Sequence, residues 1–267
     1  NVCINNPLGT PELAHLRLHI FRSALLLVLR QLDHRVLAKL LHRLVPVLIR
    51  IGKVALCLIV DPLTVEHLHE EIIVVVRARS RLLGVIIPQE YGGAGLDTVS
   101  YEIVVEEISR KCAATGVVTS VHNSLAAWPI MKYGSEEQKK KYLPILAKGE
   151  KIGAFAGTEP NAGSDLGAMS TTATLKGDKY IINGDKTFIT SGPEAGIIIV
   201  FAVTDKKAGA KGISAFIVES DMKGYKVGSI FEKLGINASK TSELIFENME
   251  VPKQNLLGKE GEGFKIC

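Results

Sequence analysis

The sequence contains few cysteines and no apolar run long enough to cross a membrane. Its four cysteines are Cys3, Cys57, Cys112 and Cys267. They are widely separated and form no C-x-x-C pair, which argues against a disulfide framework and against a cysteine-based zinc site. The best candidate for a membrane segment, residues 44–60, is interrupted by Arg50 and Lys53, whereas a span needs about 20 apolar residues. We therefore expect a protein of a reducing compartment with no membrane span.

The signatures of several common enzyme classes are also missing. No G-x-G-x-x-G, G-x-x-x-x-G-K-[ST], H-E-x-x-H or G-x-S-x-G motif occurs, so Rossmann, P-loop, zincin and esterase assignments lose their main support. A metal site is not indicated, because His15 and His19 have helical spacing but no third ligand beside them.

Positive charge is concentrated in one segment of the chain. Residues 1–60 carry a formal charge of +6, whereas the whole chain carries +4. A nucleic-acid interface combines positive charge with base-reading or stacking groups, but this segment has a single aromatic residue, Phe21. We expect no nucleic-acid partner. The segment is also rich in arginine and poor in acids, as mitochondrial transit peptides are, but its only serine is Ser23.

What is present is the composition of a folded globular protein, with 46% hydrophobic and 22% charged residues. Leucines recur at helical spacing through residues 10–87, and further helical patterns cover residues 100–111 and 135–148. The last of these begins with a capping box, Ser135 to Gln138. These patterns predict an all-α N-terminal domain over residues 1–150.

From Ile152 onward the apolar period changes to two. Strands are predicted over residues 172–175, 180–182, 186–189, 197–203, 214–218 and 243–246. Asn183-Gly184, between the second and third of these, is typical of a tight hairpin. We therefore expect residues 151–267 to form an antiparallel β domain, a barrel or a sandwich, and the fold class to be α+β.

Two turns at strand ends are candidates for ligand binding. Residues 157–165 (GTEPNAGSD) form a glycine-containing turn in which backbone N–H groups and the hydroxyls of Thr158 and Ser164 could hold phosphate or polar ring oxygens. Residues 189–192 place further hydroxyls and donors at another strand end. Two such rims in one domain suggest a shared ligand. The alternatives are an ordinary turn that joins domains and, for Thr190, a simple β-branched strand residue.

Seven blocks of the sequence, in order and at matching spacing, resemble the acyl-CoA dehydrogenases. They are residues 86–96 (IIPQEYGGAGL), 115–125 (TGVVTSVHNSL), 133–142 (YGSEEQKKKY), 153–165 (GAFAGTEPNAGSD), 182–192 (INGDKTFITSG), 233–241 (KLGINASKT) and 251–266 (VPKQNLLGKEGEGFKI). The resemblance covers about residues 82–267, whereas residues 1–81 are atypical. The SVHNSL and KLGINASKT blocks are most similar to the short-chain, butyryl-CoA dehydrogenase branch.

The resemblance implies a helical N-terminal domain, a β middle domain and a C-terminal four-helix domain, with FAD bound between the last two. It implies α,β-dehydrogenation of a short-chain acyl-CoA thioester to a trans-2-enoyl-CoA, with electrons passed to an electron-transfer flavoprotein. It also implies a homotetramer in the bacterial cytoplasm or the mitochondrial matrix. Two alternatives remain: a flavin monooxygenase or oxidase on the same scaffold and, from a different class, a non-catalytic assembly or docking module.

Site residues follow from the resemblance position by position. Those expected to bind the cofactor are Phe155, Ala156, Gly157, Thr158, Gly163, Ser164, Phe188, Ile189 and Thr190. Thr190 would face the flavin N5 atom, and Ser164 would also bind the CoA substrate. Many relatives have tryptophan in place of Phe188, a larger aliphatic residue in place of Gly157 and a basic residue in place of Asn237.

No catalytic base is expected in this chain. The resemblance places the glutamate base of the short-chain branch in the C-terminal helical domain, beyond Cys267, and part of the adenine site as well. Glu159 neighbours the flavin loop, but in relatives it is a structural member of that loop. We therefore expect a protein that lacks the C-terminal domain and the base.

Overall fold

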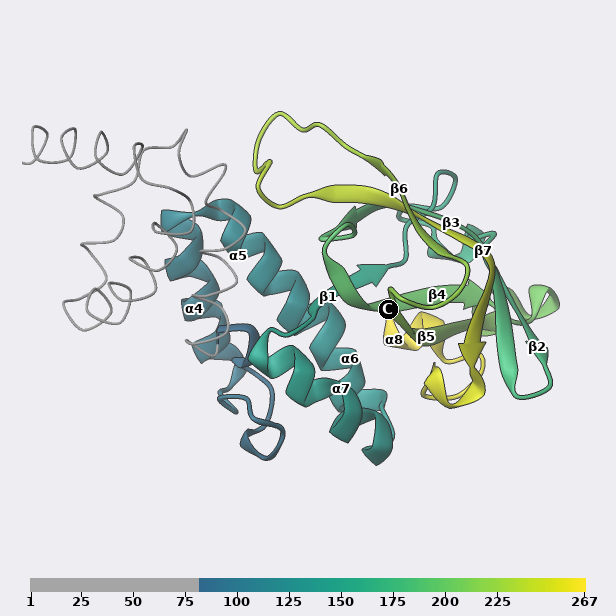
Figure 1. Ribbon diagram of the computed structural model, residues 1–267, viewed down its shortest axis with the longest axis horizontal. Coiled ribbons are helices and arrows are strands. Elements are labelled where there is room, and N and C mark those ends of the chain that lie inside the picture. Colours follow the sequence, from purple (N-terminus) through teal and green to yellow (C-terminus); the bar gives the residue numbers. More distant parts are fainter. Residues whose placement is uncertain (1–81) are drawn as a thin grey trace, which may run out of the picture. The chain divides into compact units, whose positions relative to one another are not determined.

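The computed structural model describes residues 82–267, which lie in the second of two compact units of the chain (Figure 1). The helices expected before residue 82, including the pair His15 and His19, lie outside the described residues. The helices described are α4 (Thr98–Lys111), α5 (Ala113–Ser120), a π-helical segment (Val121–Ala127), α6 (Trp128–Tyr133), α7 (Glu136–Lys148) and the short α8 (Gly263–Ile266). None of the described helices is long and apolar enough to span a membrane.

Helix α7 begins where the sequence predicts. The Ser135 hydroxyl accepts a hydrogen bond from the Gln138 N–H at 3.2 Å, and the Gln138 side chain accepts one from the Ser135 N–H at 3.0 Å. These two bonds satisfy donors that the first helical turn leaves unpaired. Gly149 ends the helix in the left-handed conformation at φ 71°, so both boundaries are set locally.

A mixed sheet follows the helices. Its strands are β1 (Ile152–Ala156), β2 (Thr172–Lys176), β3 (Lys179–Thr190), β4 (Ala195–Val203), β5 (Ile213–Glu219), β6 (Tyr225–Ile230), β7 (Thr241–Pro252) and β8 (Leu256–Leu257). Their order is β6-β7-β3-β2-β4-β5-β8, with β1 paired to β4. Most pairs are antiparallel, but β1 runs parallel to β4, and β2 meets β4 in one parallel pair. The α+β fold class is confirmed.

The sheet is open, not a closed barrel. Strands β6 and β8 stand at the two ends of its order and do not pair with each other. The sheet is nevertheless strongly curved. Buried side chains of β3 and β7 pack in one cluster with those of β4 and β5, on the inner side of the curve. The alternating pattern in the sequence is the same for a curved open sheet and for a barrel, so it could not predict whether the edges meet.

The predicted hairpin at Asn183-Gly184 is wrong. These residues lie inside strand β3, where Gly184 has φ 143° and the register against β7 shifts between Ile182 and Gly184. The tight turn lies before them, where Lys176 pairs with Lys179 across a two-residue turn. Strand β3 pairs with β7, which is distant in the sequence, on both sides of Asn183-Gly184. The strand therefore continues past the predicted turn, and a bulge marks the place.

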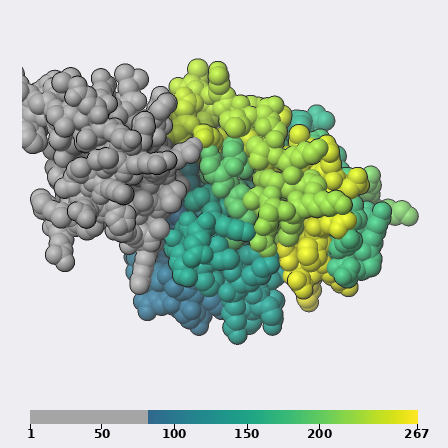
Figure 2. Space-filling model, in the orientation of Figure 1, coloured from purple at the N-terminus to yellow at the C-terminus, as the bar shows by residue number. Residues whose placement is uncertain are grey.

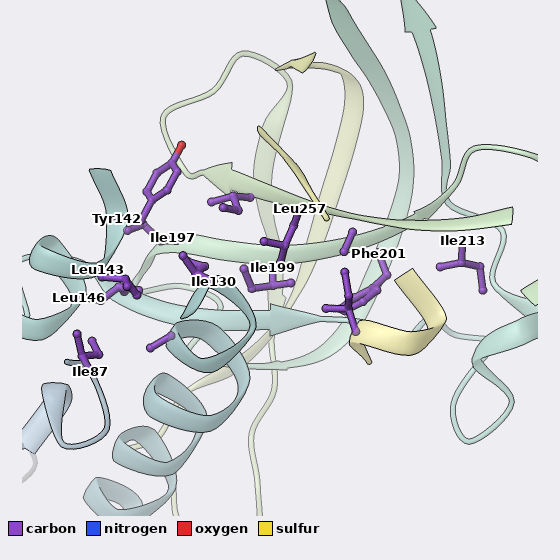
Figure 3. Packing of buried hydrophobic residues seen from close by; sticks show 14 of the residues in the cluster. Ile87, Ile130, Tyr142, Leu143, Leu146, Ile197, Ile199, Phe201, Ile213 and Leu257 are labelled. Carbon is purple, nitrogen blue, oxygen red and sulfur yellow. The ribbon is translucent and has the colours of Figure 1, made fainter. Parts of the chain in front are cut away.

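Strand β4 is buried on both faces. Ile197, Ile199 and Phe201 belong to a buried cluster with residues of α6, α7 and α8, in which Ile197 lies toward the α7 residues and Phe201 lies beside α8 (Figure 3). The residues between them belong to the second cluster, inside the curve of the sheet. This double burial explains the near-continuous apolar run of β4 and fixes the helices against the sheet.

Candidate functional site

The two turns expected to share a ligand lie side by side in the structure. The loop of residues 157–165 follows β1, and the second turn, residues 189–192, begins with the last two residues of β3 and directly follows Phe188. The Thr187 N–H donates a hydrogen bond to the Thr158 carbonyl oxygen at 3.0 Å, directly joining the two segments. Residues about 30 positions apart in the sequence therefore form one rim of the sheet.

The first turn is tight and leaves donors unused. Glu159 and Ala162 exchange two backbone hydrogen bonds, of 2.9 and 3.1 Å, which fold the loop back on itself. Gly163 and Ser164, which follow, are exposed, and within the described chain their N–H groups donate to no other residue. A Cβ placed on Gly163 would have no atom within 4 Å, so the space in front of it is open. Adjacent free N–H groups of this kind suit an anionic ligand.

The second turn displays an aromatic ring. Phe188 has φ 56°, in the left-handed region, and lies where the register of β3 against β7 shifts between Lys186 and Ile189. This bulge turns the ring outward, so that the residue is 64% exposed. The ring packs only on Phe231 among the aromatic residues described, with centroids 5.0 Å apart and planes tilted by 31°.

Phe231 begins the loop of residues 231–240, which lies in the light-green area of Figure 2. Leu234 and Ile236 in this loop are exposed, and Ile236 has φ 57°. The Asn237 side chain accepts a hydrogen bond from the Lys233 N–H at 3.2 Å, so its polar group is used within the loop.

The remaining expected site residues differ in whether their side chains are accessible to a ligand. Thr158 and Thr190 are half-buried at the rim. Ala156 and Ile189 have buried side chains in the cluster inside the sheet, so they can meet a ligand only through the main chain. Phe155 packs on the ring of Phe201, with centroids 4.8 Å apart.

Gly157 is accommodated by the ring of Phe155. A Cβ at Gly157 would approach Phe155 Cε1 to 3.0 Å, which is tighter than ordinary contact. A larger residue at this position would therefore require Phe155 to move. The small residue and the neighbouring aromatic ring therefore fit each other.

The site contains one element that the sequence analysis missed, a buried ion pair. Lys186 Nζ lies 2.8 Å from Glu159 Oε1, and the two side chains are 0% and 2% exposed. Lys186 Nζ also donates to the Gly157 carbonyl oxygen at 3.0 Å. Ser170 and Thr171 complete the shell of Glu159 with N–H donors at 2.6 and 3.0 Å. The partner that gives Glu159 its expected structural role is therefore Lys186.

A signal for this pair exists in the sequence. Lys186 has the same parity as the buried residues Tyr180 and Ile182, so alternation alone places its side chain on the buried face. A lysine at such a position needs a partner, and the nearby acidic loop residue Glu159 supplies it.

Both charges are shifted by their surroundings. Burial alone raises the pKa of Glu159, but hydrogen bonds from Lys186, Thr171 and Ser170 outweigh it and lower the pKa to about 2. Burial lowers the pKa of Lys186, and the hydrogen bond and charge of Glu159 oppose that effect. Glu159 is therefore a carboxylate at neutral pH and is fully engaged as an acceptor, which leaves it unsuited to act as a base.

We expect the protein to lose stability in acid through Glu159. Its pKa is lower in the folded chain than in the unfolded chain, so this contribution is present above about pH 4.5 and disappears as the pH falls toward 2. The shift corresponds to about 3 kcal/mol of unfolding free energy. Urea denaturation between pH 7 and pH 3 should show a steeper decline for the native chain than for Glu159→Gln. An equal decline in both would contradict this, and the exposed Glu247→Gln serves as the control.

Two family models match the chain. The acyl-CoA dehydrogenase N-terminal domain matches residues 65–150, and the acyl-CoA dehydrogenase middle domain matches residues 154–249. The chain belongs to the acyl-CoA dehydrogenase family. The first match begins before Leu82, so part of the segment that is atypical by inspection also matches the family.

Curated relatives point to one branch of this family. The short-chain specific acyl-CoA dehydrogenase of Clostridium acetobutylicum is 56% identical over 186 residues, which are 70% of this chain and 49% of the relative. The mitochondrial short-chain specific acyl-CoA dehydrogenase of Mus musculus is 49% identical over 202 residues, with coverage of 76% and 49%. The chain spans about half the length of these relatives.

Solved structures share the fold. Butyryl-CoA dehydrogenase from Megasphaera elsdenii has a TM-score of 0.71 at 44% identity, covering 74% of this chain and 52% of that one. A chain in a structure described as the electron transferring flavoprotein of Acidaminococcus fermentans has a TM-score of 0.72 at 54% identity, with coverage of 74% and 52%. An acyl-CoA dehydrogenase complexed with FAD from Bacillus anthracis has a TM-score of 0.69 at 42% identity, with coverage of 75% and 35%.

Proposed function

We propose that this chain is the helical and flavin-binding part of an FAD-dependent acyl-CoA dehydrogenase that acts on short-chain acyl-CoA thioesters. Its residues 1–150 would form the helical domain and residues 151–267 the flavin-binding domain. The observation that carries the proposal is the joined rim, in which the Thr187 N–H bonds to the Thr158 carbonyl. The names of the relatives support the short-chain substrate.

The residues of the rim fit a flavin. Thr158, Thr190 and the free N–H groups of Gly163 and Ser164 offer donors for ring and phosphate oxygens. Phe188 offers an exposed aromatic face. When bound, the flavin would supply the hydride acceptor for removal of the β-hydrogen of the thioester. The chain's own part is to bind, orient and shield this group and, through Ser164, to contact the CoA.

Further parts of the proposal concern the whole protein. Electrons would pass to an electron-transfer flavoprotein, for which the neighbouring structure from Acidaminococcus fermentans gives support. The assembly would be a homotetramer in the bacterial cytoplasm or the mitochondrial matrix. No residue of the rim is assigned as the base that removes the α-proton, since Glu159 is held by Lys186.

The test is the visible absorption spectrum of the purified protein with FAD, recorded before and after anaerobic addition of butyryl-CoA. A flavin band supports FAD binding by the rim, and bleaching of that band by butyryl-CoA supports the dehydrogenase and requires a base from outside the rim, since Glu159 is held by Lys186. A band that is insensitive to butyryl-CoA but whose reduced form reacts rapidly with oxygen points instead to an oxidase or monooxygenase. Absence of FAD binding points to an assembly or docking module and contradicts the proposal.

We expect Phe188→Ala to weaken FAD binding by about tenfold, because the exposed ring supplies a stacking surface. Phe188→Tyr keeps that surface and should bind FAD within about twofold of the native chain. The control is Phe264→Ala, which removes another ring that is 52% exposed, on α8. Fluorescence titration with FAD measures all three. Equal affinity for Phe188→Ala and Phe264→Ala would remove Phe188 from the site.

A further inference from the structure

Three consecutive residues of the first turn are bonded to two adjacent residues of β3, Lys186 and Thr187. The carbonyl oxygen of Gly157 and the carboxylate of Glu159 both accept from Lys186 Nζ, at 3.0 and 2.8 Å. Between them, the Thr158 carbonyl oxygen accepts from the Thr187 N–H at 3.0 Å. Lys186 therefore bridges the turn on both sides of Thr158, the residue expected to touch the ligand.

The same lysine stands next to the bulge of the second turn. The register of β3 shifts after Lys186, and Phe188 takes its left-handed conformation two residues later. Lys186 is therefore the last residue of β3 that is in register with β7 before the bulge. Its side chain holds the first turn, and its main chain leads directly into the segment that carries Phe188 and Thr190.

Neither charged group is placed to touch a ligand itself. Both side chains are buried, at 0% and 2% exposure, and Glu159 receives further bonds from Ser170 at 2.6 Å (N–H) and 2.7 Å (hydroxyl). A buried ion pair is a weak source of net stability, since packed apolar side chains of similar volume often do as well. What the ion pair does provide is geometry, because charged hydrogen bonds fix the distance and angle between two segments.

We propose that Lys186 and Glu159 are positioning residues that hold the two flavin-contacting segments in register, so that their removal loosens the cofactor and alters its surroundings. This inference rests on the proposed function. It adds to that function the two buried side chains, Lys186 and Glu159, that set the geometry of the rim.

The experiment compares three forms of the full chain with the native protein. Glu159→Gln removes the charge with little change of shape, and Lys186→Met combined with Glu159→Gln replaces the pair by neutral side chains of similar length. The matched control is Lys179→Met combined with Glu250→Gln. That pair also joins β3 to another segment, at 2.7 Å, but it lies at the other end of the strand and is about 40% exposed.

Two quantities are measured. The first, in the flavin-free protein, is amide hydrogen exchange over residues 157–165 and 186–191, with β4 and β5 as internal references. The second is the dissociation constant for FAD together with the position of the visible flavin band. For the two Glu159 variants we expect faster exchange in both segments, unchanged exchange in β4 and β5, an FAD dissociation constant raised by about tenfold or more and a displaced band. The control pair should change none of these.

The outcomes separate the two proposals. Faster exchange with unchanged FAD affinity and spectrum would show that the pair is only structural and would overturn the inference, as would unchanged exchange. If the double variant does not fold, Glu159→Gln alone decides by the same criteria. If the native chain binds no FAD, the proposed function fails and the inference fails with it.

Discussion

Replacing Lys186 by methionine is expected to lower the unfolding free energy by roughly 3–5 kcal/mol, because it leaves a buried carboxylate without its cation. The lysine is fully buried, and its ammonium group is the only cation within salt-bridge distance of Glu159 among the described residues. The remaining donors, from Ser170 and Thr171, cannot supply the missing charge. Urea denaturation followed by circular dichroism measures the loss.

Two further variants test whether the loss of stability comes from the unpaired buried charge. Lys179→Met breaks an ion pair that is 40% exposed on the lysine side, so it should cost less than about 1 kcal/mol. Adding Glu159→Gln to Lys186→Met should restore a large part of the loss, because no unpaired charge then remains buried. A loss for Lys186→Met as small as that of Lys179→Met would show that the buried pair does not exist as described.

Replacing His122 by alanine is expected to cost roughly 3–5 kcal/mol of unfolding free energy, from two buried backbone groups that lose partners and from the cavity left behind. His122 is fully buried in the π-helical segment. Its Nδ1 atom accepts from the Gly153 N–H at 3.0 Å, which leaves Nε2 to carry the proton and donate to the Leu146 carbonyl oxygen at 3.2 Å. One imidazole thus ties the helices to the first residues of β1.

Two smaller substitutions separate the contributions of the two hydrogen bonds of His122. Asparagine can place an oxygen near the position of Nδ1 and keep the bond from Gly153, whereas glutamine can place its amide nearer to Nε2 and keep the bond to Leu146. Each should therefore lose less than alanine does. Equal losses for all three variants would show that cavity volume, and not these hydrogen bonds, accounts for the cost.

The consequences of His122 reach the candidate site through β1. Gly153 is so close to the helices that a Cβ there would lie 2.4 Å from the Ala126 Cβ atom. Strand β1 runs from this contact directly into the loop of residues 157–165. The helical part therefore fixes one end of the strand whose other end carries the turn expected to hold the flavin.

Local chemistry in the sequence predicted α4 and α7, whereas α5, the π-helical segment and α6 between them were not predicted as elements. The capping box at Ser135 and Gln138 and the glycine at position 149 define α7 without help from distant residues. Helix α4 begins at Thr98, slightly earlier than its apolar period indicates, because Asp97 caps it by accepting from the Ser100 N–H at 2.8 Å. In both cases the deciding bonds join residues within one turn of the chain.

Signals that depend on distant partners were less informative. Asn183-Gly184 has the composition of a hairpin, yet β7 pairs on both sides of it and keeps it within β3. The open sheet likewise results from which strands pair at long range, and alternation contains no information about closure. The resemblance to the family supplied the candidate rim residues, but not how the two turns meet.

The sequence by itself determined the boundaries of α4 and α7 to within a few residues, the alternation of strands such as β4 and β5, the family and the residue types available to a ligand. Only the tertiary structure decided that the turns after β1 and at the end of β3 share a rim, that Phe188 points outward from a bulge, and that Lys186 and Glu159 pair beneath them. The physical reason is the range of the interactions. Capping and periodicity act over a few residues, whereas a buried charge acquires its partner only when the chain brings Lys186 onto Glu159, 27 positions away.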